Sequence, residues 1–83
     1  MKVLYFAWLR QTIGVAEETV SPPAAVGVAD ELIDWLAARS AAHAAAFKDR
    51  ASIRIAIDQE FAEPGDSIRD AGEVAFFPPV TGG

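Results

Sequence analysis

The chain has 83 residues, 52% of them apolar, and a formal net charge of −5. This length supports one domain with one modest core, because chains divide into several cores only at several times this length. A two-domain enzyme is excluded, and a large substrate cavity is not expected. The chain has no cysteine, which excludes disulfides, thiolate metal sites and a cysteine nucleophile or persulfide. Its single histidine cannot build a metal site alone.

The charge is opposite in sign to that of proteins that bind phosphate backbones, so nucleic acid is not an expected partner. Residues 1–54 contain six acidic and six basic side chains, whereas residues 55–83 contain six acidic and one basic. The last third therefore carries all of the net charge. Two interpretations stay open: a solvated acidic face, or electrostatic steering toward a basic partner surface.

The longest nearly apolar run, residues 3–9, is far shorter than the roughly 20 residues of a membrane-spanning helix. The N-terminus also lacks the charged, apolar and cleavage regions of a signal peptide. We therefore expect a cytoplasmic protein with no membrane partner.

The N-terminal third predicts two strands. Residues 2–8 (KVLYFAW) are rich in β-branched and aromatic side chains and apolar on both faces, which favours a central strand covered on both sides. Residues 17–20 (EETV) predict a second, short strand that ends at a Ser-Pro-Pro sequence. We expect these two strands to form a hairpin through a loose loop around Gly14.

The middle of the chain predicts a helix over residues 28–39, where apolar side chains recur at i, i+4, i+7 and i+8. The alanine-rich residues 41–47 either extend this helix or form a separate turn for which Ser40 serves as N-cap. No nucleophile motif surrounds His43, so we expect an exposed or half-buried helix residue rather than a catalytic base.

The C-terminal half predicts strands over residues 52–57, 59–62 and 73–77, with turns at residues 64–66 and 70–72. The order strand, strand, helix, strand, short strand, strand is that of an α+β fold of the ubiquitin-like β-grasp type, a mixed sheet wrapped across one main helix. We expect the last strand to pair in parallel with the first at the sheet centre. The alternative, a split βαβ sandwich, needs a second long helix, and residues 41–47 are a poor candidate for one.

One helix can cover only one face of such a sheet, and the chain has more aromatic side chains than that face accommodates. Candidates for the uncovered face are Tyr5 or Phe6, Phe61, and one of Phe76 and Phe77. An exposed aromatic cluster of this size is typical of an interaction surface. We expect Phe6, Phe61 and Phe77 to bind a partner.

The end of the chain predicts an extended tail, residues 78–83, that leaves a domain formed by residues 1–77. Two prolines fix the backbone as a short rod, and the tail reaches roughly 20 Å beyond the last strand. Two glycines without side chains then allow the terminal carboxylate to enter a narrow channel. The residues of the tail are Pro78, Pro79, Val80, Thr81, Gly82 and Gly83.

The sequence EVAFFPPVTGG, residues 73–83, resembles the C-terminal signature of the molybdopterin synthase small subunits, the ubiquitin-like sulfur carriers of molybdenum cofactor biosynthesis. The opening KVLYFAWLRQTIG and the IAIDQEF sequence of residues 55–61 support this resemblance, which covers the whole chain. Two departures are Asp58, where the family commonly has Asn, and the Asp-Ala-Gly-Glu turn of residues 70–73, which replaces Asp-Gly-Asp-Glu. Neither departure lies in the tail.

The resemblance implies that an ATP-dependent adenylyltransferase of the ubiquitin-activating type adenylates the carboxylate of Gly83. A sulfur donor enzyme then supplies the sulfur of a terminal thiocarboxylate. The tail next enters the active site of the large subunit, where the thiocarboxylate attacks a cyclic pyranopterin monophosphate to build the dithiolene of molybdopterin. The resemblance implies no permanently bound cofactor or metal, and the chain alone would not be catalytic.

Three alternatives stay open. The chain could carry sulfur for thiazole synthesis, which the Phe-Phe-Pro-Pro approach to the tail disfavours. It could be a ubiquitin-like modifier whose activated Gly83 ends on lysines of other proteins. It could also be a pure binding module with an inert tail, for which removal of Gly82 and Gly83 would change nothing.

Overall fold

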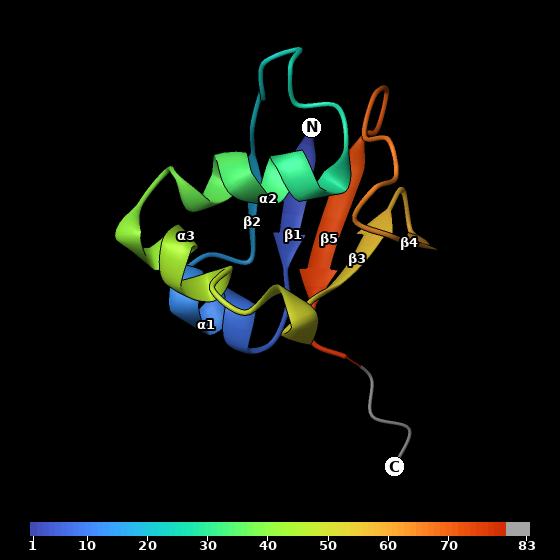
Figure 1. Cartoon of the computed structure of the whole chain (residues 1–83). Coiled ribbons are helices and arrows are strands. Elements are labelled where there is room, and N and C mark those ends of the chain that lie inside the picture. Colours follow the sequence, from blue (N-terminus) through green and yellow to red (C-terminus); the bar gives the residue numbers. More distant parts are fainter. Residues whose placement is uncertain (80–83) are drawn as a thin grey trace.

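The computed structural model describes residues 1–79, which form a five-stranded mixed sheet with three helices (Figure 1). β1 and β5 pair in parallel at the centre, and all other neighbours are antiparallel. This arrangement confirms the predicted β-grasp and the parallel pairing of the first and last strands. In sheet order the strands are β2 (Glu17–Thr19), β1 (Lys2–Tyr5), β5 (Glu73–Phe77), β3 (Arg54–Ile57) and β4 (Glu60–Ala62).

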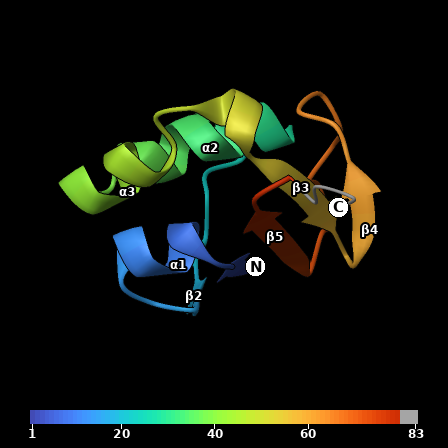
Figure 2. The ribbon, with the colours of Figure 1, turned by 90° about the horizontal axis from the view of Figure 1, so that it is seen from below.

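The helices gather on one side of the sheet, as the view from below shows (Figure 2). The longest, α2 (Ala29–Ala37), crosses β1 and β5, and α3 (Ala41–Ala46) lies between α2 and α1 (Trp8–Ile13). A single 3₁₀ turn, η1 (Arg50–Ser52), leads into β3. None of these helices within residues 1–79 is long and apolar enough to cross a membrane.

The predicted strand over residues 2–8 is wrong at its end, because β1 stops at Tyr5 and Trp8 begins a helix. The chain turns at Ala7, whose φ of 54° and ψ of −130° are unusual for a residue with a Cβ. The N–H of Leu9 donates to the carbonyl of Phe6 and closes this turn. α1 then ends at Gly14, whose φ of 97° forms a left-handed cap. The first two strands are antiparallel neighbours as expected, but a helix joins them.

The predicted main helix is confirmed as α2, with slightly narrower bounds. Val28 is its N-cap, and the Glu31 carboxylate accepts hydrogen bonds from the N–H groups of Gly27 and Val28. The alanine-rich segment forms the separate helix α3, where Ser40 Oγ accepts from the N–H of His43, as an N-cap does.

The core lies between the helices and one face of the sheet. Val3 and Tyr5 of β1 and Val74 and Phe76 of β5 point into it and are almost completely buried. Tyr5 stacks on Phe76 with ring centroids 6.3 Å apart, and Phe47 meets Phe76 edge-on at 5.1 Å. Burying each such side chain contributes about 1.5 to 3 kcal/mol.

β3 and β4 form a hairpin through the two residues Asp58 and Gln59, whose φ angles of 49° and 71° are both positive. Positive φ at both central positions is typical of the tight turns that join twisted strands. The carboxylate Oδ1 of Asp58 also accepts hydrogen bonds from the N–H groups of Gly72 and Glu73, each at 3.0 Å. The hairpin turn is thereby attached to the start of β5.

Candidate functional site

The sheet face that points away from the helices carries a row of four side chains that crosses four strands. In register they are Leu4 of β1, Ala75 of β5, Ala56 of β3 and Phe61 of β4. The two outer side chains are large and the two central ones are small. Phe61 is 83% exposed, an unusual exposure for a phenylalanine.

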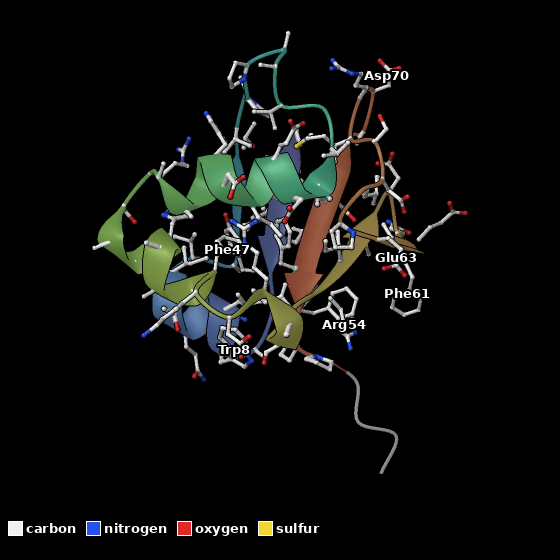
Figure 3. The ribbon with its side chains drawn as sticks, in the orientation of Figure 1. Trp8, Phe47, Arg54, Phe61, Glu63 and Asp70 are labelled. Atoms are coloured by element: carbon white, nitrogen blue, oxygen red, sulfur yellow. The ribbon has the colours of Figure 1, made fainter. Side chains whose placement is uncertain are left out.

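A second row lies nearer the C-terminal ends of β1 and β5 and contains Phe77, with Arg54 opposite it on β3. Phe6 follows β1 here, and its N–H donates to the carbonyl of Phe76. Phe6 is 49% exposed and Phe77 is half-buried. Figure 3 shows the side chains of Phe61 and Arg54 on the β3 and β4 side of the sheet, near the point where the chain leaves it.

The structure therefore distinguishes the five aromatic candidates. Phe6, Phe61 and Phe77 lie outside the core, Phe6 and Phe77 line the same hollow, and the ring of Phe61 lies 5.8 Å from that of Phe77. Tyr5 and Phe76 instead point into the core. The geometry agrees with the three residues chosen as partner-binding, whose binding role stays a prediction.

A shallow apolar hollow of about 500 Å³ lies over the middle of the first row and extends to the second. Ala56 and Ala75 form its floor, and Leu4, Phe6 and Phe77 stand around them. Sequence reasoning missed this hollow because it considered only large side chains. Two alanines at outward positions of neighbouring predicted strands would have indicated it.

The tail begins beside this hollow, which Pro78 also lines. β5 ends at Phe77, and the prolines at positions 78 and 79 have no N–H with which to continue the sheet. The C-terminal end of the central strand therefore positions the start of the tail. The other tail residues named from the sequence, Val80, Thr81, Gly82 and Gly83, lie outside the described residues.

One acidic side chain of the C-terminal third lies at the hollow. Glu73 lines the hollow at the end away from the tail. None of the salt bridges formed within residues 1–79 involves the acids that follow β3, which are Asp58, Glu60, Glu63, Asp66, Asp70 and Glu73. Their charge is therefore not neutralised within this part of the chain.

A polar cluster on the other side of the sheet has a structural role. Glu18 of β2 accepts a hydrogen bond from the Tyr5 hydroxyl, and His43 Nε2 lies 2.7 Å from the same carboxylate oxygen. Burial alone would raise the pKa of Glu18, but the hydrogen bonds with His43 and Tyr5 and the nearby charge of Arg39 together lower that pKa. His43 joins α3 to β2 and is half-buried, as expected for this helix residue.

Residues 1–79 contain no group of three or more His, Asp or Glu side chains arranged to hold a metal ion. The described side chains that line the hollow are mostly apolar.

A protein-family model described as the ThiS family matches residues 3–83 of this sequence. The chain belongs to the ThiS family. Curated relatives of this family member include the molybdopterin synthase sulfur carrier subunits of Chlamydomonas reinhardtii and Escherichia coli (strain K12), which are 38% and 36% identical to it. The alignments cover 100% of this chain and 98% and 99% of those relatives, respectively.

Solved structures of similar proteins agree with this ThiS-family assignment. One is a putative molybdopterin converting factor, subunit 1, from Pyrococcus furiosus, with a TM-score of 0.76 and 31% identity over 95% of each chain. Another is SAMP1 from Haloferax volcanii, with a TM-score of 0.73 and 26% identity over 100% of this chain and 98% of that one.

Proposed function

We propose that this protein is the sulfur carrier subunit of a molybdopterin synthase, with the carboxylate of Gly83 as its reactive group. The observation that carries the proposal is full-length similarity, at 31–38% identity, to four curated proteins that bear this name. The structure supports this proposal, because Pro78 and Pro79 directly follow β5, the central strand of the sheet.

The proposed chemistry begins with activation of the terminus. An oxygen of the Gly83 carboxylate attacks the α-phosphate of ATP on an adenylyltransferase of the ubiquitin-activating type, and diphosphate leaves. A hydrosulfide ion supplied by a sulfur donor enzyme then attacks the carbonyl carbon, and AMP leaves with the original oxygen. The product is a thiocarboxylate, which needs no cysteine in this chain.

In the second half of the proposal, the thiocarboxylate enters the large subunit of the synthase and acts as nucleophile on a cyclic pyranopterin monophosphate. Water then cleaves the acyl–sulfur bond, which leaves the sulfur on the pterin and returns the Gly83 carboxylate, and two such donations supply the two sulfur atoms of the dithiolene. Phe6, Phe61 and Phe77 dock on the large subunit while the tail extends beyond them. The apolar character of this face supports the docking, because exposed aromatic clusters are typical of interaction surfaces.

The test is mass spectrometry of the protein after incubation with its adenylyltransferase, ATP and a sulfur source. The expected mass increase equals the difference between a sulfur and an oxygen atom and maps to the C-terminal peptide. One extra alanine after Gly83, or deletion of Gly83, should eliminate the increase, because the terminus would no longer reach the α-phosphate in a reactive geometry. Circular dichroism should show both variants folded.

Two results would overturn the proposal. If the extended variant still gained sulfur without being trimmed, or if the mass change lay on an internal residue, Gly83 would not be the reactive group. If activated Gly83 were recovered only on lysines of other proteins, a ubiquitin-like modifier would replace the sulfur carrier.

A further inference from the structure

The hollow on the uncovered face differs from the aromatic cluster around it in one respect: its floor is made of the smallest apolar side chains. Ala56 and Ala75 lie side by side in the register of β3 and β5. Leu4 on one side and Phe61 on the other end the same row with large side chains. The row is therefore high at both ends and low in the middle, a shape that a flat partner surface would leave unfilled.

The floor is covered from below and open from above. Ala75 is only 7% exposed. Its neighbours on β5, Val74 and Phe76, point to the opposite face of the sheet and lie in the core. Within residues 1–79 the hollow is open to the outside, and Phe6, Phe77 and Pro78 wall it along one side. Interfaces gain most of their binding energy where one large side chain fills such a pocket and excludes water.

The charges around the hollow are unequal. Glu73 stands at one end, and its carboxylate forms no salt bridge within residues 1–79. Lys2 lies directly opposite Glu73 in the register of β1 and β5, but its ammonium is directed to Glu17, with Nζ 3.6 Å from Oε2. A carboxylate without a salt bridge of its own, beside an apolar pocket, favours a partner that brings a second cation to that position.

We propose that the hollow over Ala56 and Ala75 receives one large apolar side chain of the synthase large subunit, next to a basic side chain that meets Glu73. This inference rests on the proposed function, because it assigns the occupant to the protein that receives the tail. Pro78 supports that choice: it lines the hollow and begins the tail, so a protein that holds the tail also covers the hollow.

The steric part is tested with Ala56→Leu, which fills the hollow from its floor. The added atoms point away from the core, so the variant should fold normally. Its dissociation constant for the large subunit of the same organism, measured by isothermal titration calorimetry, should rise about tenfold or more. Ala45→Leu is the matched control, because Ala45 is exposed on α3 at the opposite side of the molecule. It should bind like the unaltered protein.

The electrostatic part is tested with Glu73→Gln, paired with Ala45→Lys, which changes the net charge by the same amount. Raising the salt concentration from about 0.05 to 0.5 M screens exposed charges and should weaken binding of the unaltered protein. This salt dependence should be reduced in Glu73→Gln and retained in Ala45→Lys. Equal salt dependence in both variants would mean that net charge, and not a cation at Glu73, acts on the partner.

The outcomes separate this inference from the proposed function. If Ala56→Leu bound the large subunit as tightly as Ala45→Leu while Gly83 still gained sulfur, the hollow would be empty in the complex and the inference would fail alone. If Ala56→Leu lost sulfur loading but kept its affinity for the large subunit, the hollow would belong to the adenylyltransferase, which also overturns the inference. If neither the variants nor the unaltered protein gained sulfur, the proposed function would fail.

Discussion

Phe61 and Phe77 lie against each other on the uncovered face of the sheet, with ring centroids 5.8 Å apart and planes tilted by 52°. Phe61 belongs to the edge strand β4, and Phe77 is the last residue of the central strand β5. The edge of the sheet thereby supports the residue from which the tail departs. The contact links a highly exposed side chain to the start of the tail.

Replacement of Phe77 with Asp should abolish binding to the large subunit while the isolated domain stays folded. Phe77 points away from the core, so the new charge meets water in the free protein but an apolar surface in the complex. Calorimetric titration measures the loss of binding, and circular dichroism checks the fold. An unfolded variant would mean that Phe77 is part of the core.

The adjacent residue should behave in the opposite way. Phe76→Ala removes a fully buried ring that contacts Tyr5 and Phe47, and it should lower the free energy of unfolding by about 3 to 5 kcal/mol. Phe77→Ala should lower it by less, about 1.5 kcal/mol, because that ring is only half-buried. Urea denaturation of both variants gives the comparison. Equal losses would contradict the assigned faces of β5.

Ala7→Gly should stabilise the protein. Only glycine adopts the φ and ψ of Ala7 without strain, and such strain costs about 1 to 3 kcal/mol. This exceeds the roughly 0.5 to 1 kcal/mol that the greater backbone entropy of unfolded glycine costs. The urea midpoint should therefore rise. Ala7→Val, whose branched side chain fits this conformation poorly, should lower it. A lower midpoint for Ala7→Gly would show that Ala7 is not strained.

Acidification should destabilise the protein partly through Glu18. Its folded pKa lies below the unfolded value, so its contribution is complete above about pH 5 and is lost as the pH falls through the folded pKa. Glu18→Gln should flatten this part of a plot of unfolding free energy against pH. Glu17→Gln is the control, because Glu17 is exposed and its salt bridge with Lys2 contributes little. Identical plots for the two variants would contradict the role of Glu18.

Asp58→Asn should leave stability within about 0.5 kcal/mol, because asparagine also tolerates positive φ and keeps the acceptor for the N–H groups of Gly72 and Glu73. Asp58→Ala loses the acceptor and should cost about 1 kcal/mol. Thermal unfolding of the two variants tests this difference. A loss in Asp58→Asn as large as in Asp58→Ala would show that the negative charge matters, and not the acceptor.

Much of the fold could be predicted because burial leaves a clear pattern. The apolar residues of β1 and β5 indicated two central strands, and the spacing of Leu32 and Leu36 indicated α2. The predicted first strand was too long, because the chain turns at Ala7. Alanine rarely adopts this backbone conformation, so the sequence did not indicate the turn. The resulting helix had one indication, the i, i+4 pair Leu9 and Ile13 followed by Gly14, but an apolar run that is hydrophobic on all sides fits a strand equally well.

The candidate site could be predicted only in part. Alternation along β5 placed one of Phe76 and Phe77 on each face, but the choice between them needed the strand register. The hollow is formed by side chains of β1, β3 and β5, which meet only after folding, so no single segment of the sequence indicated it. The Gly-Gly terminus, in contrast, is a property of the sequence alone.

The parallel pairing of β1 and β5 also determines how the domain bears mechanical load. The chain starts at one end of β1 and leaves from the opposite end of β5, so tension between the N-terminus and the tail acts along the strands. Such tension shears all four registered residue pairs together, from Lys2 and Glu73 to Tyr5 and Phe76, instead of peeling them apart singly. A partner that pulls on the tail therefore pulls against the most resistant part of the sheet.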